Sequence, residues 1–277
     1  MMTTSVRPES VPESESNTQI TASPEEPGGA MTFFEHLSEL RKRIVNSLIS
    51  VVIGAAIGWF AAPHFVDWIT RPMLKALKDA GFEQKLYYTH PAAYLNMLIT
   101  LSIYLGIVLA SPWILYQIWL FVAPALYKHE RKAITGFLFS TVFLFLAGIA
   151  FGYFVSLPYV LRFLTSFRGP VVPLMSIDEY FDFILLILLG LGLVFELPVL
   201  IFILSLFGIV TPKLLLDNFR YAVLIIAILA AVLTPTPDAL TMLVFMAVLV
   251  GLYLIGVGLS WLVVRRRERR LAAAEAR

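Results

Sequence analysis

Charged residues and cysteine are what this sequence has least of. Only 14% of its 277 residues are Asp, Glu, Lys or Arg, whereas about a quarter of a typical soluble domain is charged. Cysteine is absent, which excludes both a disulfide framework and a thiolate metal site. Because 59% of the residues are hydrophobic and the mean hydropathy is +0.82, we infer an integral membrane protein.

Common catalytic motifs are also missing. The sequence contains neither the phosphate-binding pattern GxxxxGK[ST] nor the zinc-binding pattern HExxH. Its four histidines fall near the ends of apolar runs or in polar segments, so no metal cluster is expected inside the membrane. These patterns predict a protein that is not an enzyme and that has no cofactor, no catalytic residue, no metal site and no nucleic-acid partner.

Long apolar runs separated by short polar segments make up most of the chain. They lack the alternation of barrel strands, and lipid tolerates only backbones whose polar groups are internally paired, so membrane-spanning helices are predicted. The predicted fold class is an all-α integral membrane protein with six transmembrane helices, at residues 44–66, 99–120, 134–161, 178–207, 221–233 and 239–264. The fifth is short: about 20 Å of helix against about 30 Å of hydrocarbon, which favours local thinning of the bilayer.

The chain divides into three predicted regions. Residues 1–30 are rich in Pro, Ser and Glu and are expected to form a disordered acidic tail. Residues 31–264 would form the six-helix membrane domain, and residues 265–277 a basic tail. Apolar residues recurring every three or four positions predict an amphipathic interfacial helix at Phe33–Arg43, and a long loop is expected at residues 67–100.

Several residues predict details of the helices. Gly148 and Gly152, four residues apart, favour a close helix contact. Pro112 predicts a kink or local break in the second span. Ser176 and Glu179 have the spacing of a capping box at the start of the fourth span.

Basic residues are distributed unequally between the two sides that six spans create. Loops near the cytoplasm carry an excess of Lys and Arg, so the richer side predicts the orientation. If both termini are cytoplasmic, that side holds 15 of the 21 basic residues: Arg7, Arg41, Lys42, Arg43, Lys128, Arg131, Lys132, Lys213, Arg220, Arg265, Arg266, Arg267, Arg269, Arg270 and Arg277. We therefore expect a multi-pass protein of the cytoplasmic membrane with both termini inside.

Glu196 is the only acidic residue deep inside an apolar run. A charged side chain at the centre of a membrane helix costs about 2.5 to 3.5 kcal/mol on insertion scales, so its presence needs a reason. One reading is a hydrogen bond that packs two helices together. The favoured reading is a site for a partner or an ion, and an ion-coupled secondary transporter using Glu196 is the alternative function.

Three acids, Glu35, Glu39 and Glu130, are expected at the predicted cytoplasmic surface among basic residues. Their spacing alone favours ordinary interfacial charge, with Glu39 and Arg43 as an i,i+4 pair worth a few tenths of a kcal/mol. A binding role stays open at this point.

Five motifs, in this order, resemble the TatC family of twin-arginine protein translocases. They are FFEHLSELRKR before the first span, FVAPALYKHERK between the second and third, FGYFVSLPYVLRF, GLGLVFELPV and LTPTPDAL. The resemblance extends over residues 33–264, with the five motifs spaced along that range. The TPTPD turn is one residue longer than the TPPD form associated with the family.

The resemblance implies a receptor for folded precursor proteins whose signal peptides carry consecutive arginines, with transport driven by the proton-motive force. Glu39 and Glu130 would bind the two guanidinium groups. The surrounding surface would be completed by Arg41, Arg43, Phe121, Leu126 and Tyr127.

The same resemblance implies a homo- or hetero-oligomer embedded among membrane lipids, with the single-span subunits TatA and TatB as partners. Glu196 would face a concave groove, formed by kinked spans and open to the bilayer, and would pair with a partner helix. Val232 and Leu233 would form a second partner contact. Pro72 and Asp238 would belong to structural loops.

Overall fold

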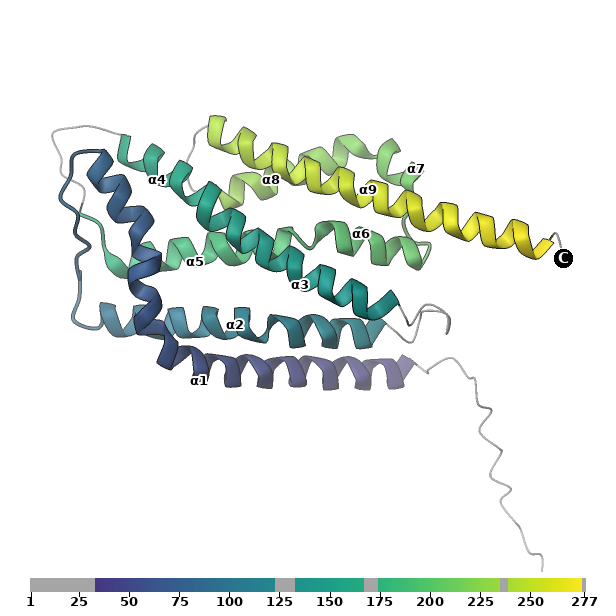
Figure 1. The fold of residues 1–277 in the computed structure, drawn as a ribbon, viewed down its shortest axis with the longest axis horizontal. Coiled ribbons are helices and arrows are strands. Elements are labelled where there is room, and N and C mark those ends of the chain that lie inside the picture. The colour runs from purple at the N-terminus through teal and green to yellow at the C-terminus, as the bar shows by residue number, and fades with distance from the viewer. Residues whose placement is uncertain (1–32, 123–132, 167–173, 235–238, 276–277) are drawn as a thin grey trace, which may run out of the picture.

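The computed structural model describes residues 33–122, 133–166, 174–234 and 239–275, and these are almost entirely helical (Figure 1). In chain order the helices are α1 (Phe33–Asp79), α2 (Ala93–Val122), α3 (Ala133–Phe151), a π-helical turn (Gly152–Ser156), α4 (Leu157–Ser166), α5 (Ile177–Val194), α6 (Leu197–Leu206), α7 (Pro212–Asp217), α8 (Phe219–Leu233) and α9 (Ala239–Glu275).

The prediction of an all-α membrane protein with six spans is confirmed. Five helical segments are long and apolar enough to cross a bilayer: Leu37–Asp79, Ala93–Phe121, Leu138–Ser166, Ile177–Leu206 and Thr241–Arg266. The sixth is α8, whose 15 residues give a length of about 22 Å. The short fifth span was therefore correctly identified.

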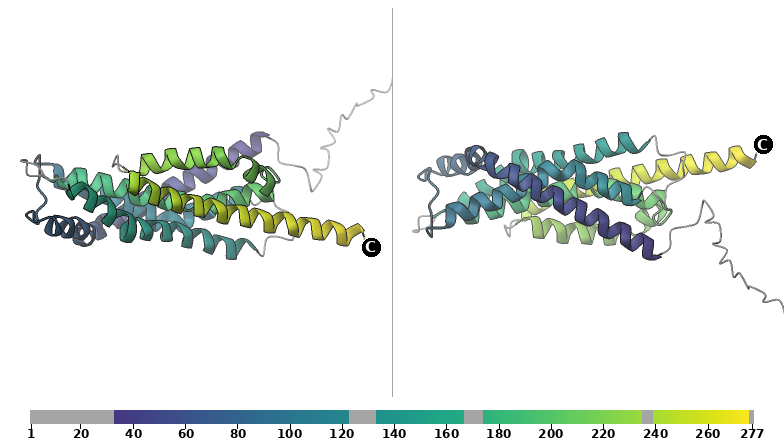
Figure 2. Two further views of the ribbon diagram at one scale, coloured as in Figure 1. Left: turned by 90° about the horizontal axis from the view of Figure 1, so that it is seen from above. Right: turned by 90° about the horizontal axis from the view of Figure 1, so that it is seen from below.

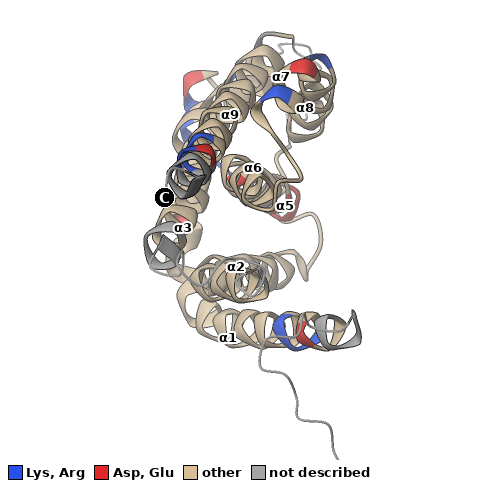
Figure 3. Cartoon of the chain, turned by 90° about the vertical axis from the view of Figure 1, so that its right-hand side faces the viewer, with Lys and Arg blue, Asp and Glu red and all other residues tan. Residues whose placement is uncertain are grey.

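The helices lie lengthwise beside one another (Figures 1 and 2). Seen nearly end-on, α1 and α2 lie at one end of the molecule and α7 and α8 at the other, with α3, α5 and α6 between them and α9 running beside α7 and α8 (Figure 3). The start of α1 and the end of α9 lie at the same end of the molecule, as an even number of crossings requires. α9 projects beyond the other helices there.

The predicted loop at residues 67–100 is wrong over most of its length. α1 continues to Asp79 and α2 begins at Ala93, so the loop comprises only residues 80–92. Polar residues suggested a loop, but Met73 and Leu77 are buried and hold this segment as a helix. α1 is bent (Figure 1) and contains Pro63 near its middle, as expected when a helix loses a backbone donor.

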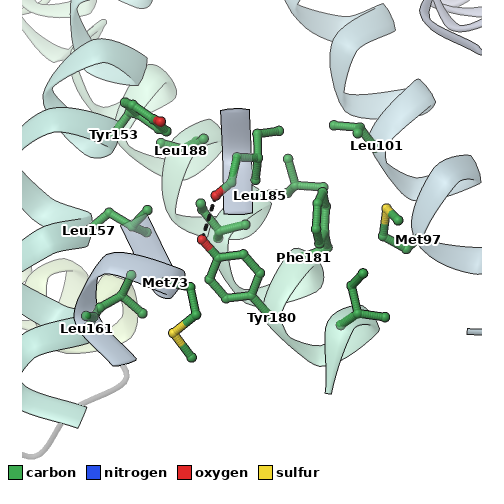
Figure 4. Close-up of a cluster of buried hydrophobic side chains, with 14 of the residues drawn as sticks. Met73, Met97, Leu101, Tyr153, Leu157, Leu161, Tyr180, Phe181, Leu185 and Leu188 are labelled. Carbon is green, nitrogen blue, oxygen red and sulfur yellow. Dashed lines mark hydrogen bonds between the residues drawn. The ribbon is translucent and has the colours of Figure 1, made fainter. Parts of the chain in front are cut away.

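Pro72 also lies inside α1, and its missing N–H would leave the carbonyl of Trp68 without a helical partner. The Tyr153 hydroxyl, on the π-helical turn, donates to that carbonyl at 2.7 Å, and its ring stacks on Trp68. Tyr180 of α5 donates to the next carbonyl, that of Ile69, also at 2.7 Å (Figure 4). Hydrogen bonds from these two tyrosines thus link the C-terminal part of α1 to the π-helical turn and to α5.

Tyr153→Phe is expected to lower the free energy of unfolding by about 1 kcal/mol, because it leaves the Trp68 carbonyl without a donor. In a Pro72→Ala background the loss should be smaller, since alanine supplies the N–H that the proline lacks. Denaturation of the purified protein by sodium dodecyl sulfate measures all three variants, with the exposed Tyr159→Phe as control. If Tyr153→Phe lowers the free energy of unfolding equally with and without Pro72→Ala, Tyr153 does not compensate for the N–H that the proline lacks.

Glycines set two of the closest helix contacts. A Cβ on Gly148 would meet the Leu191 carbonyl oxygen at 2.6 Å, which confirms the close approach of α3 to α5. A Cβ on Gly54 would meet the Gly106 carbonyl oxygen at 2.5 Å, so α1 and α2 touch backbone to backbone. Larger side chains at these positions would force the helices apart.

The predicted capping box does not form. Ser176 occupies the N-cap position of α5, but its hydroxyl does not cap the helix. It donates instead to the Asp178 carboxylate and lies 3.2 Å from the Thr89 hydroxyl. The side chain therefore joins the loop before α2 to the start of α5.

Candidate functional site

Glu39, Arg43 and Gln117 form a polar cluster, here called the rim cluster, where α1 and α2 lie together. Glu39 and Arg43 are one turn apart on α1, and the Arg43 Nη2 donates to Glu39 Oε1 at 2.9 Å. The Arg43 Nη1 donates to the Gln117 side-chain oxygen at 3.1 Å. One guanidinium thus links a carboxylate of α1 to an amide of α2.

The rim cluster is sheltered from solvent. The exposed fractions of the side chains are 14% for Glu39 and 22% for Arg43, and Gln117 is 2% exposed. Glu39 Oε2 and Arg43 Nε are buried, and neither has a hydrogen-bond partner among the described residues. A carboxylate accepts at both oxygens, so Glu39 retains capacity for a second donor.

The other residues predicted for this surface are placed only in part. Arg41 is exposed on α1, and Phe121 is partly buried in the last turn of α2, four residues after Gln117. Leu126, Tyr127 and Glu130 lie outside the described residues. α2 ends at Val122 and α3 begins at Ala133, both at the end of the molecule where α1 starts (Figure 1).

Gln117 was not singled out from the sequence. The available signal was a lone polar side chain within the apolar run WILYQIWLF, the same signal that identified Glu196. An uncharged amide inside a span attracts less notice than an acid, although it also needs a hydrogen-bond partner in lipid.

Glu196 lies where the fourth span breaks into α5 and α6. α5 ends at Val194 with Phe195 as its C-cap, and Glu196 occupies the N-cap position of α6, which begins with Leu197 and Pro198. The predicted single helix from 178 to 207 is therefore interrupted. Glu196 is partly buried, and its Oε1 atom is buried with no hydrogen-bond partner in the described part of the chain. The packing hydrogen bond within this chain, one of the two readings of Glu196, is not found there.

The two predicted partner-contact residues of α8 differ in exposure. Val232 is 72% exposed and free to meet another molecule. Leu233 is partly buried and packs toward Gly190 of α5, where a Cβ would lie 2.6 Å from its side chain. Of the two residues predicted for structural loops, Pro72 lies within helix α1, and Asp238 falls outside the described residues.

A second polar group joins the loop before α2 to the start of α5, at the opposite end of the bundle. His90 Nε2 lies 3.2 Å from Asp178 Oδ2. Backbone hydrogen bonds from Tyr87 N to Met175 O and from Ile177 N to Tyr87 O reinforce the link. Elsewhere in the same loop, a hydrogen bond from Lys85 lowers the pKa of the Glu83 carboxyl, assisted by one from Tyr87.

These features define a class: a multi-pass helical membrane protein whose polar groups gather at a rim and at a broken span. In the described ranges, no three His, Asp or Glu side chains gather as a metal site. The family model for "Sec-independent protein translocase protein (TatC)" matches residues 35–248. The chain belongs to the TatC family of Sec-independent protein translocases.

Individual relatives agree over nearly the whole chain. A TatC protein of Koribacter versatilis is 42% identical over 89% of this chain and 91% of its own length. One from Aquifex aeolicus is 34% identical over 86% and 98%. A crystal structure of the twin-arginine translocase receptor TatC superposes with a TM-score of 0.72 at 33% identity, covering 83% of this chain and 99% of that one.

Proposed function

We propose that this chain is the signal-peptide receptor of a twin-arginine translocase, in the cytoplasmic membrane with both termini inside. Its role would be binding and assembly, and not catalysis. The observation that carries the proposal is the rim cluster, in which the sheltered Glu39 has one oxygen bound to Arg43 and the other without a described partner. Glu130, between α2 and α3 in the sequence, would supply the second carboxylate.

The chemistry of the two basic side chains explains why such a site would read arginine. A guanidinium offers a planar fork of donors that matches a carboxylate, whereas an ammonium is a compact point charge. A hydrogen bond to a charged group contributes about 1.5 to 3 kcal/mol when sheltered, against about 0 to 1 kcal/mol for an exposed ion pair. The low exposure of Glu39 supports the sheltered case.

Arg43 would hold one oxygen of Glu39 and leave the other for the signal. Its guanidinium binds Glu39 Oε1 and the Gln117 side-chain oxygen. Without a signal peptide, this internal arginine keeps the carboxylate paired inside the bundle rim. An arginine of the signal would then add a second charge-assisted hydrogen bond at Glu39 Oε2, which has no partner among the described residues.

The proposed partners are TatA-like and TatB-like single-span subunits. Support comes from Glu196, whose buried oxygen is without a described donor, and from the exposed Val232 on the short helix α8. The sequence contains no nucleotide-binding motif. The energy for transport must then come from another source, and the resemblance to the TatC family implies the proton-motive force.

The proposed receptor function predicts preference for the twin-arginine pair itself. The purified chain in nanodiscs should bind a fluorescent Arg-Arg signal peptide about 10-fold or more tightly than its Lys-Lys version, because lysine cannot bind a carboxylate through two donors in one plane. Fluorescence anisotropy measures both. Equal affinity for the two peptides would show that net charge alone attracts them and would overturn the proposed recognition.

A further inference from the structure

A groove runs along the line where α1 meets α2, with a volume of about 500 Å³. We call it the α1–α2 groove. Among the five long spans, α1 is the one least buried within the chain, since only 11% of its most apolar stretch is buried. The residues that matter here are Asn46, Ile49, Ser50, Ile53 and Ile57 of α1, and Trp113 of α2.

Small residues create the groove. The backbone contact of Gly54 with Gly106 brings the helices together, and Gly54 forms part of the groove wall. Larger side chains line it from both helices, with Ile49 and Ile53 on α1 and Trp113 on α2. A groove built on a backbone contact is part of the resting structure and needs no rearrangement to receive a ligand.

The polarity of the groove changes along its length. Asn46 and Ser50 lie toward the start of α1, whereas Ile53 and Ile57 line the continuation. The Asn46 amide makes no hydrogen bond within the described part of the chain, and Ser50 donates only to the Ser47 carbonyl at 2.6 Å. Lys42 precedes Asn46 by one turn on the same helix face and is exposed. Within the described ranges it makes no ion pair. From the start of α1 onward, a charged side chain is therefore followed by polar side chains and then by apolar ones.

The length of the groove decides between two kinds of occupant. From Asn46 to Ile57 the helix rises about 16 Å, close to the roughly 15 Å of a single leaflet and about half of the roughly 30 Å that a spanning helix must cover. A second membrane helix would have to pass beyond both ends of the groove. A lipid of one leaflet fits its length and its order of polarity.

We propose that the α1–α2 groove binds one anionic glycerophospholipid of the leaflet on the side where α1 begins. Lys42 contacts the phosphate, Asn46 and Ser50 hydrogen-bond the ester region, and an acyl chain lies along Ile53 and Ile57. The lipid thereby covers apolar surface beside the rim cluster, whose Arg43 lies one residue after Lys42.

Native mass spectrometry of the full chain tests this proposal, with phosphatidylglycerol and phosphatidylcholine of identical acyl chains as probes. Wild type should retain one phosphatidylglycerol in preference to phosphatidylcholine. Lys42→Gln should weaken phosphatidylglycerol binding about fivefold, the effect of one basic residue at an anionic surface. Ile49→Trp should fill the groove and remove the bound lipid. Leu48→Trp, at the neighbouring exposed position that does not line the groove, should leave it bound.

Three results would overturn the assignment. One is equal retention of the two lipids by wild type, and another is unchanged retention of phosphatidylglycerol in Lys42→Gln or in a folded Ile49→Trp. The third is a change of oligomeric mass in Ile49→Trp with lipid retention intact, which would assign the groove to a second copy of the chain. Lys42→Gln alters an exposed side chain without touching the helix contact, so its result stands even if Ile49→Trp fails to fold.

Discussion

Glu39→Ala is expected to weaken binding of an Arg-Arg signal peptide by about 10- to 150-fold, corresponding to loss of a sheltered charge-assisted interaction of about 1.5 to 3 kcal/mol. The substitution removes the carboxylate and leaves Arg43 held by Gln117 alone. An unpaired guanidinium at the rim would also repel the arginines of the signal. Both effects act in the same direction, which is why the expected loss is large.

Two further variants separate the charge of Glu39 from its role in packing. Glu39→Gln keeps the shape and can still accept from Arg43, so the fold should be retained while signal binding falls. Glu268→Ala removes an exposed acid near the end of α9, at the same end of the molecule, and should bind normally. Fluorescence anisotropy in nanodiscs measures all three. Wild-type affinity in both Glu39 variants would refute the proposed role of this carboxylate.

The sequence predicts the part of the rim cluster that lies within α1, but not the part contributed by α2. The i,i+4 spacing of Glu39 and Arg43 predicted their pairing, and the structure confirms it. The contribution of Gln117 was not accessible, because it depends on how α1 is aligned against α2. That alignment is set by the contact of Gly54 with Gly106, which no local pattern reveals.

The helix boundaries show a similar division between local and tertiary causes. Apolar runs located all six spans, because lipid imposes a minimum length and excludes unpaired backbone. The prediction of a loop in the second half of α1 is wrong, because Pro72 lies among charged residues and no local pattern reveals what stabilises this segment. Burial of Met73 and Leu77 stabilises the helix, and Tyr153 satisfies the carbonyl that the proline leaves. Tyr153 is 85 residues away from its partner Trp68 in the sequence.

Glu196→Ala is expected to lower copurification of a TatA-like or TatB-like subunit while leaving signal-peptide affinity unchanged. Interhelical hydrogen bonds in membranes average about 0.6 kcal/mol and reach about 1.7 kcal/mol, which corresponds to a loss of about 3- to 18-fold in association. The isolated chain should be as stable as wild type or more so, because an intramembrane acid without a described donor is removed. If Glu196→Ala raises the stability of the isolated chain and weakens its association with the partner subunit, the carboxyl group contributes to partner binding and not to folding.

Glu196→Gln and Glu179→Ala serve as the matched variants in this experiment. The amide can still accept and donate, so Glu196→Gln should retain much of the association, whereas Glu179→Ala removes an exposed acid at the start of α5 and should behave as wild type. Quantitative pull-down with each subunit and proton flux into proteoliposomes are measured on the same preparations. Normal assembly together with an altered flux would favour the ion-coupled transporter, because Glu196 would then serve an ion and not a helix.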